Sequence, residues 1–313
     1  MTGRIITCDH KIYELPELLE WDIVHTGGVP CDSFSATCAY MAELALPLHR
    51  AESFLALNGQ SLLLHGIVDE YTIRQSAAGR TVTITGRGLA ARLLDNESRP
   101  ATYQTAALRD IVRAHVTPYG ISCVQCADVR AGSVYTVAAG TSQWNALEEF
   151  CRVYGGFTPT FRRNGELAAA PRSAGNRIVL NDGTTLLSVT KRENHYGVLS
   201  EVLVIDKTRN TSQTVQNKEF IARGGQCRRV LYTPGQSTWA AMRYTGAYQI
   251  ARSAENEEIL TAVLPGSRIV SPGDLAEVSL SGCGLSGEYA VTQCENACCP
   301  EGETTTLTMK RRG

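Results

Sequence analysis

The feature that most constrains the fold is a period of two in the hydrophobic pattern, which recurs along the chain to its C-terminal end. The clearest runs span residues 33–40, 81–85, 276–281 and 306–310, where apolar side chains alternate mainly with Ser, Thr, Glu and Lys. Successive side chains of a strand point to opposite faces, so this pattern is typical of strands with one buried face. Glycine and proline separate the runs, as they commonly do between strands. The chain is therefore predicted to be mainly β.

Helical spacing of apolar residues is confined to a few places. One helix is predicted after Thr105, a favourable N-cap, and it should end at Pro118. A second should begin at Thr141 or Ser142 and end at the glycines 155–156, which suit a helix C-cap. Both lie in one stretch of the chain, which suggests a small α/β unit among the strands.

A third helix, rich in alanine, is predicted over residues 237–252. Its narrow packing face is predicted to consist of Trp239, Met242, Gly246 and Ile250. With the helices placed, we divide the chain into a first β domain (1–98), a small α/β domain (99–172) and a second β domain (173–313) with a mixed insert around 207–262.

Composition narrows the range of functions. The 313 residues include 30 basic and 31 acidic side chains, a formal charge of −1, which does not favour sequence-specific binding of nucleic acid. No run of 18 apolar residues predicts a membrane span. The first residues lack the apolar core of a signal peptide, so we expect assembly in the cytoplasm of the producing cell.

One glycine-rich motif is similar to a dinucleotide-binding fingerprint. Residues 86–91 fit G-x-G-x-x-A between a predicted strand and a short helix. A nucleotide site would follow a strand that is apolar throughout, whereas residues 81–85 alternate Thr with Val and Ile. No parallel strand ending in an acidic residue follows. We therefore interpret the glycines as a tight strand-to-helix turn and predict no cofactor site.

Eleven cysteines are many for a chain without a signal peptide, and we expect them to be reduced and mostly buried. Cys123 and Cys126 form a C-x-x-C in a strand pattern, where a redox pair would need a helix N-terminus. A second cluster, expected in a loop, consists of Cys294, Cys298 and Cys299. The two clusters are too far apart in sequence for a compact zinc module, so no metal site is predicted. The role of the second cluster is left open.

No catalytic residue is predicted. The histidines form no metal-binding or catalytic pair and are expected to be exposed or hydrogen-bonded: His10, His25, His49, His65, His115 and His195. A carboxylate pair in space is left open, because the sequence spacing selects none. Three basic pairs could touch a phosphate backbone but are interpreted as solvated turn or edge residues: Arg162-Arg163, Arg228-Arg229 and Arg311-Arg312.

The order of segments carries a resemblance to a known family. Residues 52–98 give two strands, a glycine-punctuated strand and a short helix just before Pro100. This order resembles the first domain of bacteriophage tail baseplate hub proteins of the phage Mu and T4 types, the late control D-like, two-barrel tail hubs. The resemblance continues in order through residues 99–103, 118–121, 140–151, 161–167, 264–274 and 287–291, with Asn164-Gly165 as the turn of a hairpin.

That resemblance implies a mainly β (α+β) architecture of two β-barrel-like domains, a small α/β domain and a mixed insert. It implies a homotrimer whose six barrels form a ring, because a trimer can match a hexamer only through an internal duplication. The ring would join the hexameric tail tube to the tail spike or tip, with the tape-measure protein as a further partner. The protein would belong to the virion tail, and DNA would pass through its channel without sequence-specific contacts. No enzymatic activity is implied.

Three other functions remain open from the sequence. A tail-associated cell-wall-degrading enzyme would need a catalytic carboxylate pair or a Cys/His site. The equivalent hub of a contractile injection system or bacteriocin would share the same fold and contacts. A carbohydrate-binding tip module would expose Trp21, Trp144 or Trp239 for stacking on sugar, although Trp144 is expected in the core.

Overall fold

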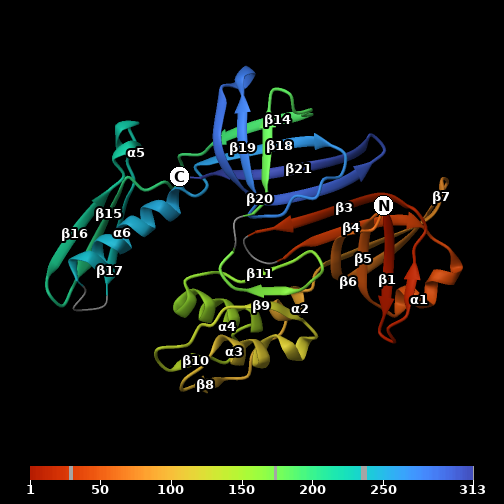
Figure 1. Ribbon diagram of the computed structural model, residues 1–313, viewed down its shortest axis with the longest axis horizontal. Coiled ribbons are helices and arrows are strands. Elements are labelled where there is room, and N and C mark those ends of the chain that lie inside the picture. The colour runs from red at the N-terminus through yellow and green to blue at the C-terminus, as the bar shows by residue number, and fades with distance from the viewer. Residues whose placement is uncertain (28–30, 173–174, 234–237, 313) are drawn as a thin grey trace.

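The computed structural model describes residues 1–27, 31–172, 175–233 and 238–312. Its dominant feature is one mostly antiparallel sheet in which the described strands run in the order β14-β18-β21-β20-β3-β4-β7-β6-β5-β1-β2, with β19 beside β20 and β13 parallel to β19. The sheet curls around two separate cores and does not close on itself among these strands, so each half is barrel-like (Figure 1). The predicted mainly β class is confirmed.

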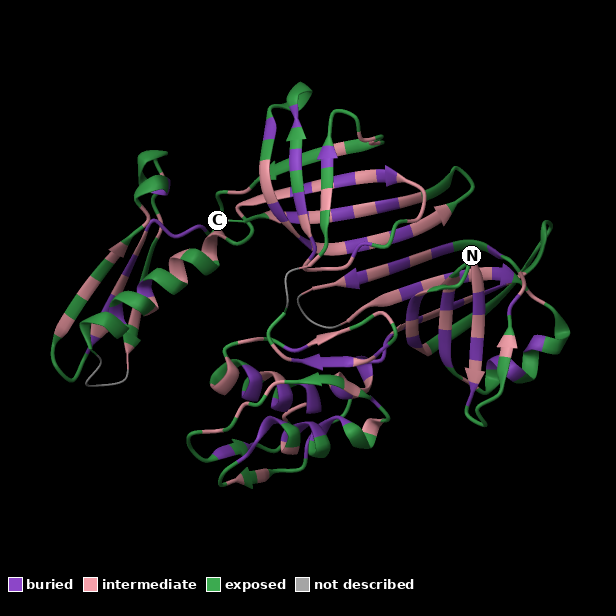
Figure 2. Ribbon diagram, in the orientation of Figure 1, coloured by how far each residue is buried: buried purple, intermediate pink, exposed green. Residues whose placement is uncertain are grey.

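The first lobe is the N-terminal half of this sheet, and its core is built from the inward face of each strand. In β4 the burial alternates strictly from Ser33 to Cys38, as the period-two pattern predicted (Figure 2). Phe34 and Phe54 stack with ring centroids 4.5 Å apart at the centre of the core. The elements of this lobe are β1 (Thr2–Thr7), β2 (Ile12–Glu14), β3 (Leu18–Thr26), β4 (Ser33–Ala39), η1 (Ala42–Leu44), α1 (Ala45–His49), β5 (Ala51–Asn58), β6 (Ser61–Ser76) and β7 (Gly79–Gly88).

The second lobe is the C-terminal half of the sheet and has its own core around Tyr289 and Met309. The two predicted C-terminal strands are present as β19 and β21. Strand β18, at the end of the range expected for the mixed insert, pairs with β14 and β21 in this lobe. Its elements are β13 (Arg177–Asn181), β14 (Ser188–Glu193), β18 (Glu258–Pro265), β19 (Leu275–Leu280), η4 (Ser281–Cys283), β20 (Leu285–Cys299) and β21 (Gly302–Arg311).

Strands β3 and β20 form the seam between the two lobes. They pair antiparallel from Thr26 opposite Gln293 to Trp21 opposite Cys298. The buried face of the seam carries alternate residues of both strands, including Asn296, whose amide nitrogen donates to Thr305 Oγ1 at 2.9 Å. Because backbone hydrogen bonds cross the seam, the two lobes are one continuous sheet.

The small domain packs two helices against short strands, with Leu147 and Phe150 fully buried between them. The first predicted helix is present, but its N-cap is Ala107, because the Asp110 carboxylate accepts from the Ala107 backbone N–H at 3.1 Å. The second begins after Ser142, as predicted. The elements are α2 (Ala91–Leu94), β8 (Ala101–Tyr103), α3 (Leu108–His115), η2 (Thr117–Tyr119), β9 (Cys123–Cys126), β10 (Tyr135–Val137), α4 (Gln143–Phe150), η3 (Cys151–Gly155), β11 (Thr160–Phe161) and β12 (Leu167–Ala169).

The insert is a three-stranded sheet with a short helix, α5, and a long helix, α6, and it projects from the second lobe (Figure 1). Helix α6 covers one face of the sheet through Met242, which packs on Val202 and Val204. A Cβ at Gly246 would lie 2.6 Å from Val215 Cγ2, so this glycine lets the helix approach the sheet. The elements are β15 (Glu201–Asp206), β16 (Thr211–Gln216), α5 (Lys218–Ala222), β17 (Arg228–Thr233) and α6 (Trp239–Ala254).

The prediction for this third helix was wrong at its first turn. The helix is capped by the Thr238 hydroxyl, which accepts from the Ala241 N–H, and Ser237 lies outside the described residues. Trp239, expected on the packing face, is 60% exposed. The face of the helix that packs on the sheet carries Met242 and Gly246, and Trp239 lies off this face.

Candidate functional site

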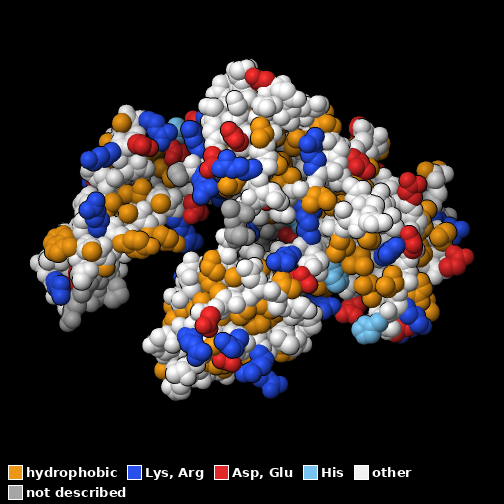
Figure 3. Space-filling model, in the orientation of Figure 1, with side chains coloured by type: hydrophobic (Ala, Val, Ile, Leu, Met, Phe, Trp, Pro, Cys, Tyr) orange, Lys and Arg blue, Asp and Glu red, His pale blue; other side chains and the backbone are white. Residues whose placement is uncertain are grey.

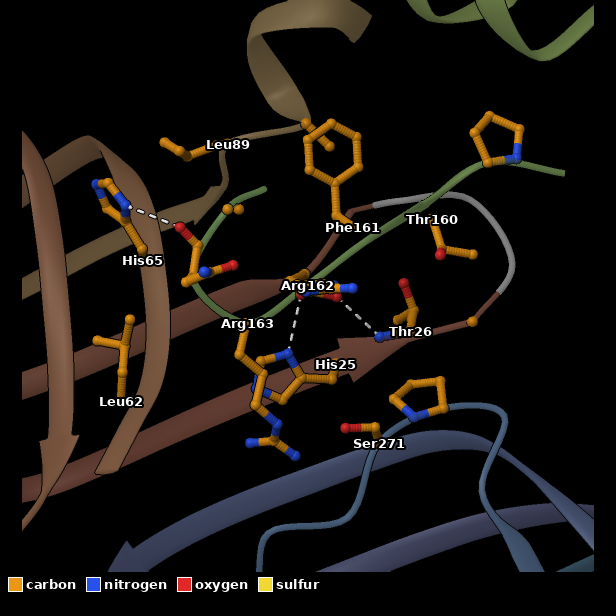
Figure 4. Close-up of a pocket in the computed structure, with 18 of the residues that line it drawn as sticks. His25, Thr26, Leu62, His65, Leu89, Thr160, Phe161, Arg162, Arg163 and Ser271 are labelled. Carbon is orange, nitrogen blue, oxygen red and sulfur yellow. Dashed lines mark hydrogen bonds and ion pairs between the residues drawn. The ribbon is translucent and has the colours of Figure 1, made fainter. Parts of the chain in front are cut away.

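The three main bodies of the chain meet around a cavity of about 400 Å³. The first lobe contributes the ends of β3 and β7 and the start of β6, the small domain contributes the hairpin between β11 and β12, and the second lobe contributes Ser271 and Pro272 (Figure 4). We call this the junction pocket. The pocket therefore lies where both lobes and the small domain contact one another.

His25 forms the wall of the junction pocket at the seam. Its side chain is almost fully buried, and its Nδ1 lies 2.9 Å from Asp32 Oδ2. The other carboxylate oxygen of Asp32 accepts from the Thr26 backbone N–H at 2.9 Å, so the carboxylate ties the end of β3 to the start of β4 (Figure 4). His25 Nε2 has no hydrogen-bond partner among the residues that the structure describes. This pair holds the end of β3 in place at the seam.

The hairpin of the small domain docks on the first lobe at His65. The His65 backbone N–H donates to the Arg163 carbonyl at 2.8 Å, and its Nδ1 lies 3.2 Å from the Asn164 carbonyl (Figure 4). Burial lowers the pKa of His65, which favours the neutral imidazole. The predicted Asn-Gly turn is present, with Gly165 at a φ of 79°.

Arg163 reaches from this hairpin into the second lobe, and its expected solvated position was wrong. Its Nη2 donates to the Val270 carbonyl, while Nε and Nη1 are buried without a hydrogen-bond partner. Burial lowers the pKa of this guanidinium. The sequence around Arg162-Arg163 did not predict this burial, because the guanidinium is removed from water only where the two lobes and the small domain pack together. The other predicted pairs, Arg228-Arg229 and Arg311-Arg312, are exposed as expected.

The glycine-rich motif of residues 86–91 lies beside this junction and serves close packing. A Cβ at Gly86 would lie 1.9 Å from the Ile67 carbonyl oxygen, so only glycine fits there. Arg87 forms ion pairs with Asp69 and Asp95, each at 2.8 Å. The helix that follows, α2, has four residues. The motif thus fixes the end of β7 against its neighbour strand.

The cysteines differ from the prediction in two ways. Cys294 and Cys298 were expected in a loop but lie in β20 on the seam, opposite His25 and Trp21, and Cys299 is its last residue. The loop prediction failed because β20 is a 15-residue strand whose far end is paired on both sides. The expectation of mostly buried thiols was also wrong, since the buried ones are Cys38, Cys151 and Cys294.

Cys123 and Cys126 do lie in a strand, β9, as predicted. No group of three or more His, Cys, Asp or Glu side chains in the described ranges could hold a metal ion. His115 is buried in a polar network, with its Nδ1 2.7 Å from Gln143 Oε1 and its Nε2 3.0 Å from the Tyr103 hydroxyl. Trp144 is buried, as predicted, and Trp21 is also buried and cannot stack on a sugar.

The insert carries a different kind of candidate site, an exposed aromatic surface. Several large aromatic side chains of the described chain are exposed here, and the space-filling view shows hydrophobic atoms gathered over the insert (Figure 3). Trp239, Arg243 and Tyr244 border a shallow hollow on helix α6, together with Gln213 on β16. We call this the α6 surface. Aromatic and arginine side chains with this exposure are typical of protein interfaces.

The fold of this chain is similar to the folds of solved phage tail proteins. A tail protein from Neisseria meningitidis MC58 superposes with a TM-score of 0.78 at 16% identity, over 100% of this chain and 97% of that one. The 43 kDa tail protein of prophage MuSo2 from Shewanella oneidensis gives 0.80 at 15% identity, over 99% and 98%. A component of the Escherichia coli type VI secretion system gives 0.56 at 10% identity, over 95% and 74%.

The predicted resemblance to tail hub proteins is therefore confirmed at the level of the fold. No protein-family model and no curated protein matches the sequence. No helix among the described residues is long and apolar enough to cross a membrane.

Proposed function

We propose that this chain is a structural tail hub, which forms a homotrimeric ring between the hexameric tail tube and the tail spike or tip. The ring would enclose a central channel for DNA and the tape-measure protein. Its place would be the virion tail, and its work would be mechanical, with no enzymatic activity.

The observation that carries this proposal is the seam between β3 and β20. It joins two barrel-like lobes into one sheet, so each chain offers two comparable β bodies in fixed relation. Three such chains would present six lobes, which is the number needed to meet a sixfold tube. The superpositions on two tail proteins cover nearly the full length of both chains, which supports the same proposal. We propose the division 1–98, 99–172 and 173–313, with the insert inside the last part.

The test is the absolute mass of the purified protein by light scattering, followed by negative-stain imaging of the main peak. A mass of three chains with a ring and a central hole is the expected result. Purified tail-tube protein from the same genome should then bind one end of the ring. A protein that stays monomeric and does not bind tube protein would contradict the proposal.

A second candidate is the equivalent hub of a contractile injection system. The observation that favours it is the likeness to the Escherichia coli type VI secretion component. The two functions share a fold, so the neighbouring genes distinguish them. Capsid and terminase genes beside this one would indicate a phage, and their absence beside intact sheath and tube genes would indicate an injection system.

A further inference from the structure

Charge is divided unequally between two ends of the molecule. The first lobe, residues 2–88, carries six basic and ten acidic side chains, a net charge of −4. The insert, residues 201–254, carries eight basic and three acidic side chains, a net charge of +5. The two regions lie at opposite ends of the molecule with the second lobe between them (Figure 1). Within one chain, therefore, these opposite charges do not meet.

The α6 surface has the composition of a contact site on the basic end. Trp239 is 60% exposed and Tyr244 is 74% exposed, although burying each would be favourable. Arg243 lies between them and has no ion-pair partner among the described residues. A partner for this surface needs both apolar side chains and carboxylates.

The first lobe offers such a partner over residues 12–20, which we call the acidic segment. Ile12 and Leu19 are exposed at 62% and 54% of their surfaces, and Leu19 falls where the β3–β4 register shifts. Three exposed acidic side chains lie among them and form no ion pair in the described part of the chain: Glu14, Glu17 and Glu20. Strand β2, within this segment, is the last strand of the sheet and has a free edge.

We infer that the α6 surface of one copy docks on the acidic segment of a second copy. This inference rests on the proposed hub function and names the contact that would close its ring. A contact between two different surfaces is head-to-tail, and it generates a closed ring when the rotation that relates neighbouring copies closes, here after three copies. Aromatic burial would supply the affinity, and the pairing of Arg243 with carboxylates would set the orientation.

The experiment measures the mass of the full chain by sedimentation over a range of concentrations, alone and with tail-tube protein. Trp239→Ala and Arg243→Glu should each weaken self-association at least about tenfold, since hot-spot residues contribute about 1.4 kcal/mol or more. Both residues are exposed, so folding should be unaffected. Tyr196→Ala is the matched control, since Tyr196 is 92% exposed but lies outside the α6 surface, and it should associate as the wild type does.

A charge exchange gives the decisive result. Glu17→Arg together with Glu20→Arg should weaken association, and combining them with Arg243→Glu should restore much of it. If the wild type forms trimers and the Trp239→Ala and Arg243→Glu variants associate as strongly as it does, the inference is overturned and the proposed hub function is unaffected. A wild type that is monomeric alone and with tube protein would overturn both.

Discussion

The seam and the insert both use a β-sheet, yet they place aromatic side chains in opposite environments. Trp21 on the seam is 4% exposed because β3 is paired on both sides and packs on the first core. Trp239 on the insert is 60% exposed because α6 contacts its small sheet mainly near Met242 and Gly246. The seam thus buries its tryptophan within one chain, whereas the insert leaves apolar surface exposed to solvent.

The largest effect should separate the two tryptophans. Trp21→Ala should lower the free energy of unfolding by about 3–5 kcal/mol, because it removes a large side chain from a packed core. Trp239→Ala should change it by less than about 0.5 kcal/mol, because that side chain is exposed. Denaturant titration followed by far-UV circular dichroism measures both, and equal losses would contradict the division between seam and insert.

A smaller loss is expected for the polar network beneath the seam. Asn296→Ala should cost about 1–3 kcal/mol, because Thr305 Oγ1 and the Arg268 carbonyl each lose the amide that donates to them in a buried site. The exposed Gln75→Ala on β6 serves as the control, and its change should stay within about 0.5 kcal/mol. Thermal unfolding of the two variants side by side tests this, and no loss in Asn296→Ala would contradict it.

The junction pocket should respond in the other direction. Arg163→Met should raise the free energy of unfolding by about 1 kcal/mol, because an apolar chain of similar length replaces a guanidinium with two buried nitrogens that have no hydrogen-bond partner among the described residues. Arg162→Met on the same hairpin is the control, since Arg162 is exposed. A marked loss of stability in Arg163→Met would show that the bond to the Val270 carbonyl outweighs the burial of charge.

The smallest effect concerns pH at the seam. Burial raises the pKa of Asp22 above its ordinary value of 3.8, and its Oδ1 is buried without a partner. The stability that the protonated form gives is present at low pH and is lost as the pH rises through the raised pKa. Asp22→Asn should therefore stabilise the protein at pH 7 by less than about 1 kcal/mol, with no gain near pH 3. Melting temperatures across this range measure it, and a gain independent of pH would exclude the titration of Asp22 as its cause.

Local pattern was enough to predict much of the fold. The alternation over residues 33–40 and 306–310 predicted β4 and β21, because a half-buried strand needs that period wherever it lies. Ser142 predicted the start of α4, because a cap acts on its own helix. The environment of a side chain that touches distant segments was not predictable in this way, as Trp239 and Arg163 show.

By itself, then, the sequence determined the β class, the positions of the three longest helices and the order of segments that resembles tail hubs. These features depend on interactions between residues that are close in sequence, and the local pattern of residue types predicts such interactions. Only the tertiary structure decided that β3 meets β20 across more than 250 residues, that Cys294 lies on that seam, and that Arg163 is buried where three bodies join. Such contacts depend on how far-apart segments pack, and a single sequence does not encode that packing in any short pattern.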